Sequence, residues 1–407
     1  MNATPDDPPP EDPVPSGTAA RPFQPEYAQQ AASWRALIGV FLKLGVVAFG
    51  GPVAHIAMMD TEVVERRRWV HRRHFLDLMA ATNLLPGPNS TQMTMHVGYV
   101  QRGNLGVWAA GSAFILPAAT ITLALTWAYV ALRELPVMDA VFYGIQPVVL
   151  AIIAVAMVKL APRAASDLRT RLVFVGALGL GLFGINELLV LAIGAVAGVA
   201  LYHQWPRGGA RGILLTTSPW LLGAAPAPSP DPDTVGQLAW LFLKFGVTLF
   251  GSGYLLVAYL QTDLVDRTGL LTTPQLLEAI VIGEMTPGPL FTVSTAVGYI
   301  VGGFPGAVVA TVAIFAPSFL LAMLLGRIMP AVKRSRVAGN VLKGLTAAVL
   351  GVMLAVAIEI GLRVVVDLPT AGLAVGALAA LIWTRVSAIA LIPAAGVVGY
   401  LWVTFVG

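Results

Sequence analysis

The segment LLPGPNSTQMTMHVGY, residues 84–99, interrupts an apolar stretch with the triplet Pro-Gly-Pro. The same triplet recurs in EMTPGPLFTVSTAVGY, residues 284–299. Proline removes a backbone donor and disrupts a helix interior, so each triplet predicts a broken helix. In hydrocarbon, non-helical backbone is tolerated only where protein or a polar cavity surrounds it. Two matching breaks therefore predict a buried feature that the chain uses twice.

The composition indicates that most of the chain lies in lipid. Hydrophobic residues make up 57% of the sequence and charged residues only 11%, whereas soluble domains carry about 25% charged residues. Apolar runs such as AVVATVAIFAPSFLLAMLLG, residues 307–326, are long enough to cross a core of about 30 Å and lack the alternation of barrel strands. The absence of cysteine excludes disulfides and thiol chemistry. We expect an all-α polytopic membrane protein.

An internal repeat divides the chain into two halves. FLKLGVVAFGGP, residues 41–52, matches FLKFGVTLFGSG, residues 242–253, at seven of twelve positions, and the Pro-Gly-Pro triplets share the same offset of 201. The sequence therefore predicts four parts: a disordered, proline-rich acidic tail (1–33), a first membrane repeat (34–205), a proline-rich linker (206–235) and a second membrane repeat (236–407).

The charge of matched loops changes sign between the two halves. Residues 61–74 carry a net charge of +3 and their counterpart 263–274 a net −1, while 127–140 carry −1 and 327–340 carry +4. Because positively charged loops stay in the cytoplasm, the halves are predicted to lie in opposite orientations. Such an inverted repeat is typical of secondary transporters.

The same loop charges predict an incomplete crossing at each triplet. Two apolar segments separate the positive loop 61–74 from the negative loop 127–140, and two full crossings would return the chain to the same side. One segment must therefore fail to cross. We expect 75–100, and its copy 275–300, to form re-entrant or broken hairpins.

The breaks also supply a candidate anion site. Pro88 suits the first position of a half-helix and Gly87 the cap before it. The free N–H groups and the positive dipole end of such a half-helix favour an anion, and the hydroxyls that follow add donors. Kinks that neighbouring helices relieve are the alternative explanation. The candidate substrate-binding residues are Lys43, Gly50, Gly51, Pro86, Gly87, Pro88, Asn89, Ser90, Thr91, Lys244, Gly251, Ser252, Thr286, Pro287, Gly288, Pro289 and Thr292.

Two matched lysines and two unmatched histidines lie within apolar segments. Lys43 and Lys244 would supply positive charge for a dianion, since charges at membrane depth mark binding sites, or they would snorkel to the interface. His55 and His96 have no counterpart in the other half, and we expect both to be satisfied core residues.

One acidic residue is a candidate for proton coupling. Glu284 stands three residues before the second triplet, where the first half has Asn83. A carboxylate beside an anion site is a poor ligand unless it is protonated, so Glu284 is a candidate proton carrier; a capping or packing acid is the alternative. Glu187 and Glu359 lie nearer predicted helix ends and are weaker candidates.

Catalytic and cofactor motifs are scarce. The sequence has no cluster with metal-ligand spacing and no nucleotide-binding fingerprint, so we expect no cofactor, no metal and no nucleic-acid partner. An ion gradient is therefore the expected energy source for transport.

Four segments carry a family resemblance: FGGPVAHIAMM (49–59), LPGPNSTQ (85–92), FGSGYLLVAYL (250–260) and TPGPLFTVSTAVGY (286–299). They resemble the chromate ion transporter family in its long, fused two-domain form, and the resemblance extends from residue 34 to 407. It implies export of chromate across the plasma membrane, driven by a proton gradient or the membrane potential, with sulfate as a close analogue. The motif residues it implies are Phe49, Gly50, Gly51, Pro52, Pro86, Gly87, Pro88, Phe250, Gly251, Pro287, Gly288 and Pro289.

Several alternatives stay open at this point. The family pattern often has glutamine where this chain has Glu284, which favours a protonatable role there. A carrier of sulfate or another oxyanion, an importer, a passive channel and a membrane-embedded enzyme acting on lipid phosphate are the competing functions. The sequence is compatible with a homodimer in the lipid bilayer.

Overall fold

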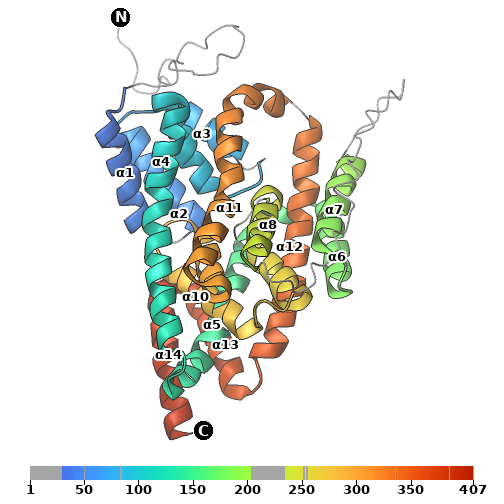
Figure 1. Cartoon of the computed structure of the whole chain (residues 1–407). Coiled ribbons are helices and arrows are strands. Elements are labelled where there is room, and N and C mark those ends of the chain that lie inside the picture. Colours follow the sequence, from blue (N-terminus) through green and yellow to red (C-terminus); the bar gives the residue numbers. More distant parts are fainter. Residues whose placement is uncertain are drawn as a thin grey trace, which may run out of the picture.

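The structure confirms the all-α class. It is a computed structural model, and it describes residues 30–49, 51–82, 85–202, 234–250, 253, 255–334, 336–384 and 386–406. Every regular element in these ranges is a helix (Figure 1). The predicted tail and linker lie almost entirely outside the described residues.

The same series of helices occurs twice along the chain. The first series is α1 (Trp34–Val47), α2 (Gly51–Met59), η2 (Asp60–Arg66), α3 (Arg72–Thr82), α4 (Asn89–Leu132), α5 (Pro136–Ala164), α6 (Leu168–Leu182) and α7 (Glu187–Tyr202). The second is α8 (Thr234–Thr248), α9 (Leu255–Tyr259), η4 (Leu260–Arg267), α10 (Thr273–Met285), η5 (Leu290–Thr292), α11 (Val293–Arg334), α12 (Arg336–Val364), α13 (Leu368–Trp383) and α14 (Ala388–Phe405). Each element of the first series has a counterpart in the second at an offset of about 200 residues.

Five helices of the described chain are long and apolar enough to cross a membrane. They are Asn89–Leu132, Val137–Pro162, Leu290–Leu324, Gly339–Val364 and Ala388–Phe405. This finding agrees with a polytopic membrane protein.

The longest helix of each half reverses direction near its start. In α4, Arg102 and Gly103 have non-helical dihedral angles, and Gly98 lies so close to Gly106 that neither position has room for a Cβ. Eight residues of continuous helix would separate these two glycines by about 12 Å. The chain therefore turns back at Gly103, and α11 does the same at Gly303.

The Pro-Gly-Pro segment of the first half is the tip of a hairpin, and its re-entry into the membrane stays a prediction. The side chain of Gln101 donates to the carbonyl oxygen of Trp69 at 2.8 Å and accepts from the amide of Ala32 at 2.7 Å. The chain therefore enters before α3 and leaves at Gln101 on the same side. With 11 residues, α3 spans about 16 Å, roughly half of a hydrocarbon core.

A second hairpin lies beside the first one. Here α1 leads inward to Ala48, and α2 and η2 lead back to Trp69, whose carbonyl holds Gln101. The sequence predicted a helix start at this break but not a second hairpin. Both hairpins have their equivalents in α8–η4 and α10–α11.

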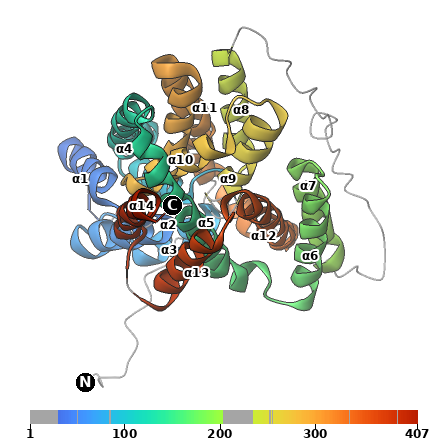
Figure 2. The ribbon, with the colours of Figure 1, turned by 90° about the horizontal axis from the view of Figure 1, so that it is seen from below.

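The last two helices of each half pack against the other half. The pair α6 and α7 packs on α12, and the pair α13 and α14 packs on α5, an exchange that is visible from below in Figure 2. Glycines allow these close approaches: Gly198 touches the backbone of Gly344, and Gly144 touches that of Gly399. The two halves are therefore interlocked rather than side by side.

Matched helices run in opposite directions. Figure 1 places the junction of α4 and α5 at the bottom of the molecule and the matched junction of α11 and α12 at the top. This arrangement agrees with the opposite orientations that the loop charges predict, whereas the orientation of the chain in a membrane stays a prediction.

Candidate anion site at the hairpin tips

The tips of the hairpins from the two halves meet and bond crosswise. The amide of Gly87 donates to the carbonyl oxygen of Leu249 at 2.6 Å, and the amide of Gly288 donates to that of Ala48 at 2.8 Å. Ala48 and Leu249 end α1 and α8, so each Pro-Gly-Pro tip pairs with the other break of the opposite half. The structure thus brings all four breaks together.

Both central glycines are required by conformation and by space. Gly87 and Gly288 have φ angles of +110° and +93°, which L side chains rarely adopt. A Cβ on Gly87 would lie 2.5 Å from Oγ of Ser318, and one on Gly288 would lie 2.6 Å from Cβ of Ala118. Each tip therefore packs on the long helix of the other half, immediately after Pro117 or Pro317.

Three buried hydroxyl groups on the helices next to the tips have no hydrogen-bond partner among the described residues. Thr91 and Ser294 stand in the first turns of α4 and α11, and Ser318 faces Gly87. A buried polar atom left without a partner costs about 1–3 kcal/mol. These hydroxyls are thus available to a polar ligand that enters between the tips.

Two other predicted hydroxyls are already engaged. Thr286 donates to the carbonyl oxygen of Ile282 at 2.6 Å, and Thr292 donates to that of Pro289 at 3.0 Å. They stabilise helix ends in this conformation, so the first half offers Thr91 while the second offers Ser294 and Ser318. Ser318 was absent from the predicted site. The available signal was its position directly after Pro317, which matches Pro117 of the first half at an offset of 200.

The first tip is held by a local polar network. The side-chain amide of Gln92 donates to the carbonyl oxygen of Pro86 at 2.5 Å. His55 contacts Oγ of Ser90 at 3.3 Å and the carbonyl oxygen of Ala48 at 3.0 Å, which agrees with the expectation of a satisfied histidine.

The helix after this tip starts one residue later than predicted. α4 begins at Asn89, and Pro88 is its cap instead of its first residue.

The remaining predicted glycines and Ser252 are only partly observed. Gly51 opens α2 with a φ of +75°. Gly50, Gly251 and Ser252 lie outside the described residues, so the expected cap at Ser252 stays a prediction.

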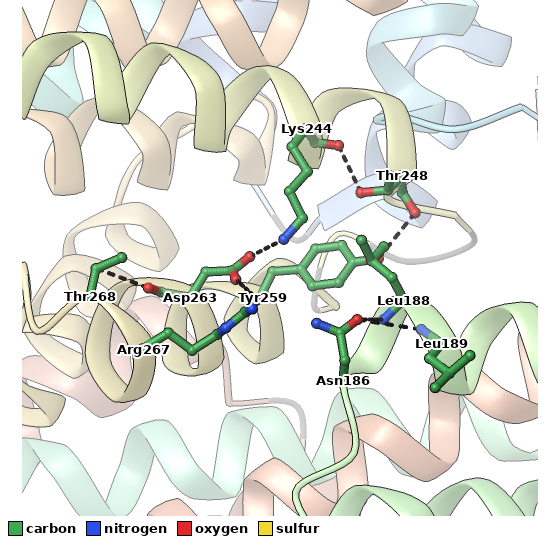
Figure 3. Close-up of polar contacts among 9 residues, drawn as sticks. All are labelled: Asn186, Leu188, Leu189, Lys244, Thr248, Tyr259, Asp263, Arg267 and Thr268. Carbon is green, nitrogen blue, oxygen red and sulfur yellow. Dashed lines mark hydrogen bonds and ion pairs between the residues drawn. The ribbon is translucent and has the colours of Figure 1, made fainter. Parts of the chain in front are cut away.

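Each predicted lysine is paired with a carboxylate. Nζ of Lys43 lies 2.9 Å from Glu62, and Nζ of Lys244 lies 2.6 Å from Asp263. An arginine one turn further on binds the same acid in each half: Arg66 to Glu62 at 3.1 Å and Arg267 to Asp263 at 3.0 Å. We call these sets the Lys43 group (Lys43, Glu62 and Arg66) and the Lys244 group (Lys244, Asp263 and Arg267); Figure 3 shows the second.

These ion pairs change the role of the lysines. Each lysine is held by a carboxylate in this conformation, so neither Nζ is free to meet a dianion. The sequence analysis missed the acids, although Glu62 and Asp263 are related by the same offset of 201 as the lysines.

The two groups differ in burial. The side chain of Lys43 is 57% exposed and that of Glu62 11%, whereas the values for Lys244 and Asp263 are 16% and 3%. The hydrogen bond from Lys43 holds the pKa of Glu62 below its usual value, so this acid is ionised at neutral pH.

Glu284 lies beside the second tip. It lines a small cavity between α9, α10 and the start of α11, together with apolar residues that include Leu256, Ile280, Leu290 and Val293. Its place next to the Pro-Gly-Pro segment is as predicted, while its role in proton coupling stays a prediction.

Comparison with known proteins identifies the family. The sequence profile of the chromate transporter family matches residues 35–199 and again residues 236–400. The chain belongs to the chromate transporter family. The double match within this chromate transporter homologue agrees with the twofold series of helices.

Relatives along most of the chain support this assignment. The chain is 32% identical to a chromate transport protein of Cupriavidus metallidurans over 86% of its own length and 88% of that protein. It is 31% identical to one of Pseudomonas aeruginosa over 91% and 92%, and 32% identical to a probable chromate transport protein of Synechococcus elongatus over 84% and 88%. No solved structure matches this chromate transporter homologue. The expectation of a multi-pass membrane transporter rather than an enzyme is confirmed.

Proposed function

We propose that the protein exports chromate across the plasma membrane as a secondary active transporter, with the four hairpin tips as its substrate site. The observation that carries this proposal is the crosswise pairing of Gly87 with Leu249 and of Gly288 with Ala48, next to helices whose buried hydroxyls have no partner among the described residues. Chromate is the proposed substrate because the family and the relatives are named for its transport.

The chemistry of the tips suits a tetrahedral dianion. The half-helix that begins at Asn89 and the one that begins at Val293 both point their N-termini into this region, and such ends attract negative charge. The hydroxyls of Thr91, Ser294 and Ser318 add neutral donors. An oxyanion would take the place of the two amide–carbonyl bonds that close the centre here, and the two inverted halves would rock around it.

The proposal also specifies the energy source and the transported ion. A proton gradient or the membrane potential drives export, with Glu284 as the proposed proton carrier beside the anion. Sulfate has the same charge and shape as chromate, so a cage of N–H and O–H donors distinguishes the two poorly, and a sulfate carrier or importer is the second candidate. We also propose that the protein forms a homodimer.

Flux in proteoliposomes tests the proposal directly. The purified protein is reconstituted, and labelled chromate uptake is measured with and without an imposed pH gradient or membrane potential, with sulfate as competitor. We expect flux that depends on the gradient and that sulfate inhibits. Chromate flux that does not depend on the pH gradient or on the membrane potential would indicate a channel. Transport of sulfate without chromate would indicate that sulfate is the substrate of the same site.

The variants Ser318→Ala and Thr91→Val test the site itself. Each removes a hydroxyl from the tips without altering the backbone, so we expect the apparent affinity for chromate to fall severalfold. Thr346→Val on α12 is a matched control because its hydroxyl already donates to the carbonyl oxygen of Leu342 at 2.8 Å. Unchanged affinity in both site variants would place the anion elsewhere.

A further inference from the structure

Glu187 is a buried carboxylate that the substrate site does not use. It begins α7 and is 3% exposed, and its Oε1 has no hydrogen-bond partner among the described residues. The cap of α7 is supplied by Asn186, whose Oδ1 accepts from the amides of Leu188 at 3.0 Å and Leu189 at 3.4 Å. Asn186 therefore caps these two amides, and the carboxylate of Glu187 contacts the amide of its own residue.

The matched position in the second half carries no acid. Ser387 caps α14 as Asn186 caps α7, and the next residue is Ala388 where the first half has Glu187. An acid that merely belonged to the fold would be expected in both copies. This carboxylate therefore occurs in the first half only.

The surroundings of Glu187 are the Lys244 group and a tyrosine. Glu187 interacts electrostatically with Asp263, Lys244 and Arg267, and with the ring hydroxyl of Tyr259. Figure 3 shows Lys244 and Arg267 both directed at Asp263, with the start of α7 beside Tyr259. Because α7 packs on α12 of the other half, Glu187 reaches this group across the boundary between the halves.

Lys343, Arg169 and Glu359, which lie on the helices that pack on α7, bind groups other than Glu187. Lys343 of α12 and Arg169 of α6 lie over the ring of Tyr202, at the opposite end of α7. Glu359 of α12 pairs with Arg363 at 2.6 Å.

The formal charges around Glu187 balance only when it is ionised. Asp263 is held by two cations at once, Lys244 and Arg267, which leaves one positive charge in excess. Ionised Glu187 compensates this excess, whereas protonated Glu187 leaves it. The free energy of the Lys244 group therefore depends on the protonation of Glu187, because charges interact strongly where water is excluded.

We propose that Glu187 is a proton-binding site of the transport cycle, separate from Glu284, and that its protonation releases Lys244 from Asp263. This inference rests on the proposed function, since it names the coupled ion and its carrier. Glu187 takes up a proton when its end of α7 opens to water on one side of the membrane. It releases the proton to the other side when the halves have rocked.

A short chain of contacts joins this site to the hairpin tips. The hydroxyl of Thr248 donates to the carbonyl oxygen of Lys244 at 2.7 Å, and Tyr259 donates to the carbonyl oxygen of Thr248 at 3.4 Å. The next residue, Leu249, accepts the amide of Gly87. A shift of Lys244 is therefore transmitted through the end of α8 to the tip that would hold the anion.

The test separates chromate exchange from proton-driven accumulation. Wild type and Glu187→Gln are reconstituted, and two quantities are measured: exchange of labelled chromate at equal pH, and chromate accumulation under a pH gradient with a lumenal pH dye. We expect Glu187→Gln to keep exchange within about twofold of wild type and to lose at least tenfold in accumulation and in chromate-dependent proton flux. Glu359→Gln, which removes an ion-paired acid from α12, serves as the control and should behave as wild type.

The outcomes distinguish this inference from the proposed function. Absence of chromate exchange in the wild type would overturn the proposed function, while normal accumulation and proton flux in Glu187→Gln would overturn the inference alone. If Glu187→Gln fails to assemble, Glu187→Asp decides the matter: a displaced pH profile of accumulation supports the inference, and an unchanged profile overturns it.

Discussion

At the scale of single residues, the matched ion pairs carry the clearest energetic consequence. Asp263 pairs with both Lys244 and Arg267 through a side chain that is 3% exposed, whereas Glu62 pairs with Lys43 at a more exposed site. Removing one partner of a buried ion pair leaves an uncompensated charge and costs about 3–5 kcal/mol. Exposed ion pairs contribute about 0–1 kcal/mol.

We therefore predict that Asp263→Ala destabilises the protein by about 3 kcal/mol, and that Glu62→Ala costs less than about 1 kcal/mol. The two variants are matched, because the same spacing of 19 residues separates each acid from its lysine. Thermal unfolding in detergent compares them. An equal loss of stability in both would contradict the difference in burial on which the prediction depends.

At the scale of elements, the sequence predicted the breaks better than the contacts they make. Proline at fixed places dictates local backbone, so the hairpin over 75–100 could be read from the triplet together with the loop charges. The crosswise bonds of Gly87 and Gly288 could not be read, because they join residues more than 150 positions apart and leave no local pattern. The partners of the lysines were missed for the same reason, although the repeat itself pointed to them.

The prolines of the tips offer a test at this scale. Pro88 disfavours helical geometry at Gly87, so Pro88→Ala allows α4 to extend backwards and to displace the tip; Pro289→Ala acts in the same way in the second half. We expect both variants to reach the membrane in normal amounts but to transport at least tenfold more slowly. Pro369→Ala, in the first turn of α13, is the control, and wild-type transport in both tip variants would contradict the role of the breaks.

At the scale of the whole molecule, opposite orientation of the halves is the central expectation. The sequence contains no cysteine, so single cysteines can be introduced without background. We predict that Glu134→Cys, at the junction of α4 and α5, reacts with a membrane-impermeant maleimide only from outside the cell. Gly339→Cys, near the matched junction of α11 and α12, should react only after the membrane is opened. Labelling of both from the same side would contradict the inversion.

Interlocked packing leads to a second prediction at this scale. Because α6 and α7 pack on α12, and α13 and α14 on α5, each half alone lacks partners for its longest buried surfaces. A chain divided within 206–235 should assemble and transport when both parts are expressed together. Expressed separately, each part should be degraded or aggregate, and a stable, monodisperse first half would argue against this packing.

The exchange of helix pairs also affects how the protein is made. A ribosome completes α7 at Tyr202, but the helix that covers it, α12, begins only at Arg336. At about 5–20 residues per second, synthesis of the intervening chain takes roughly 7–27 s. Throughout that interval the first half lacks the helix that packs against Gly194 and Gly198 of α7. Proteins that cover this face of α7 during membrane insertion would then determine what fraction of the chains reaches the folded state.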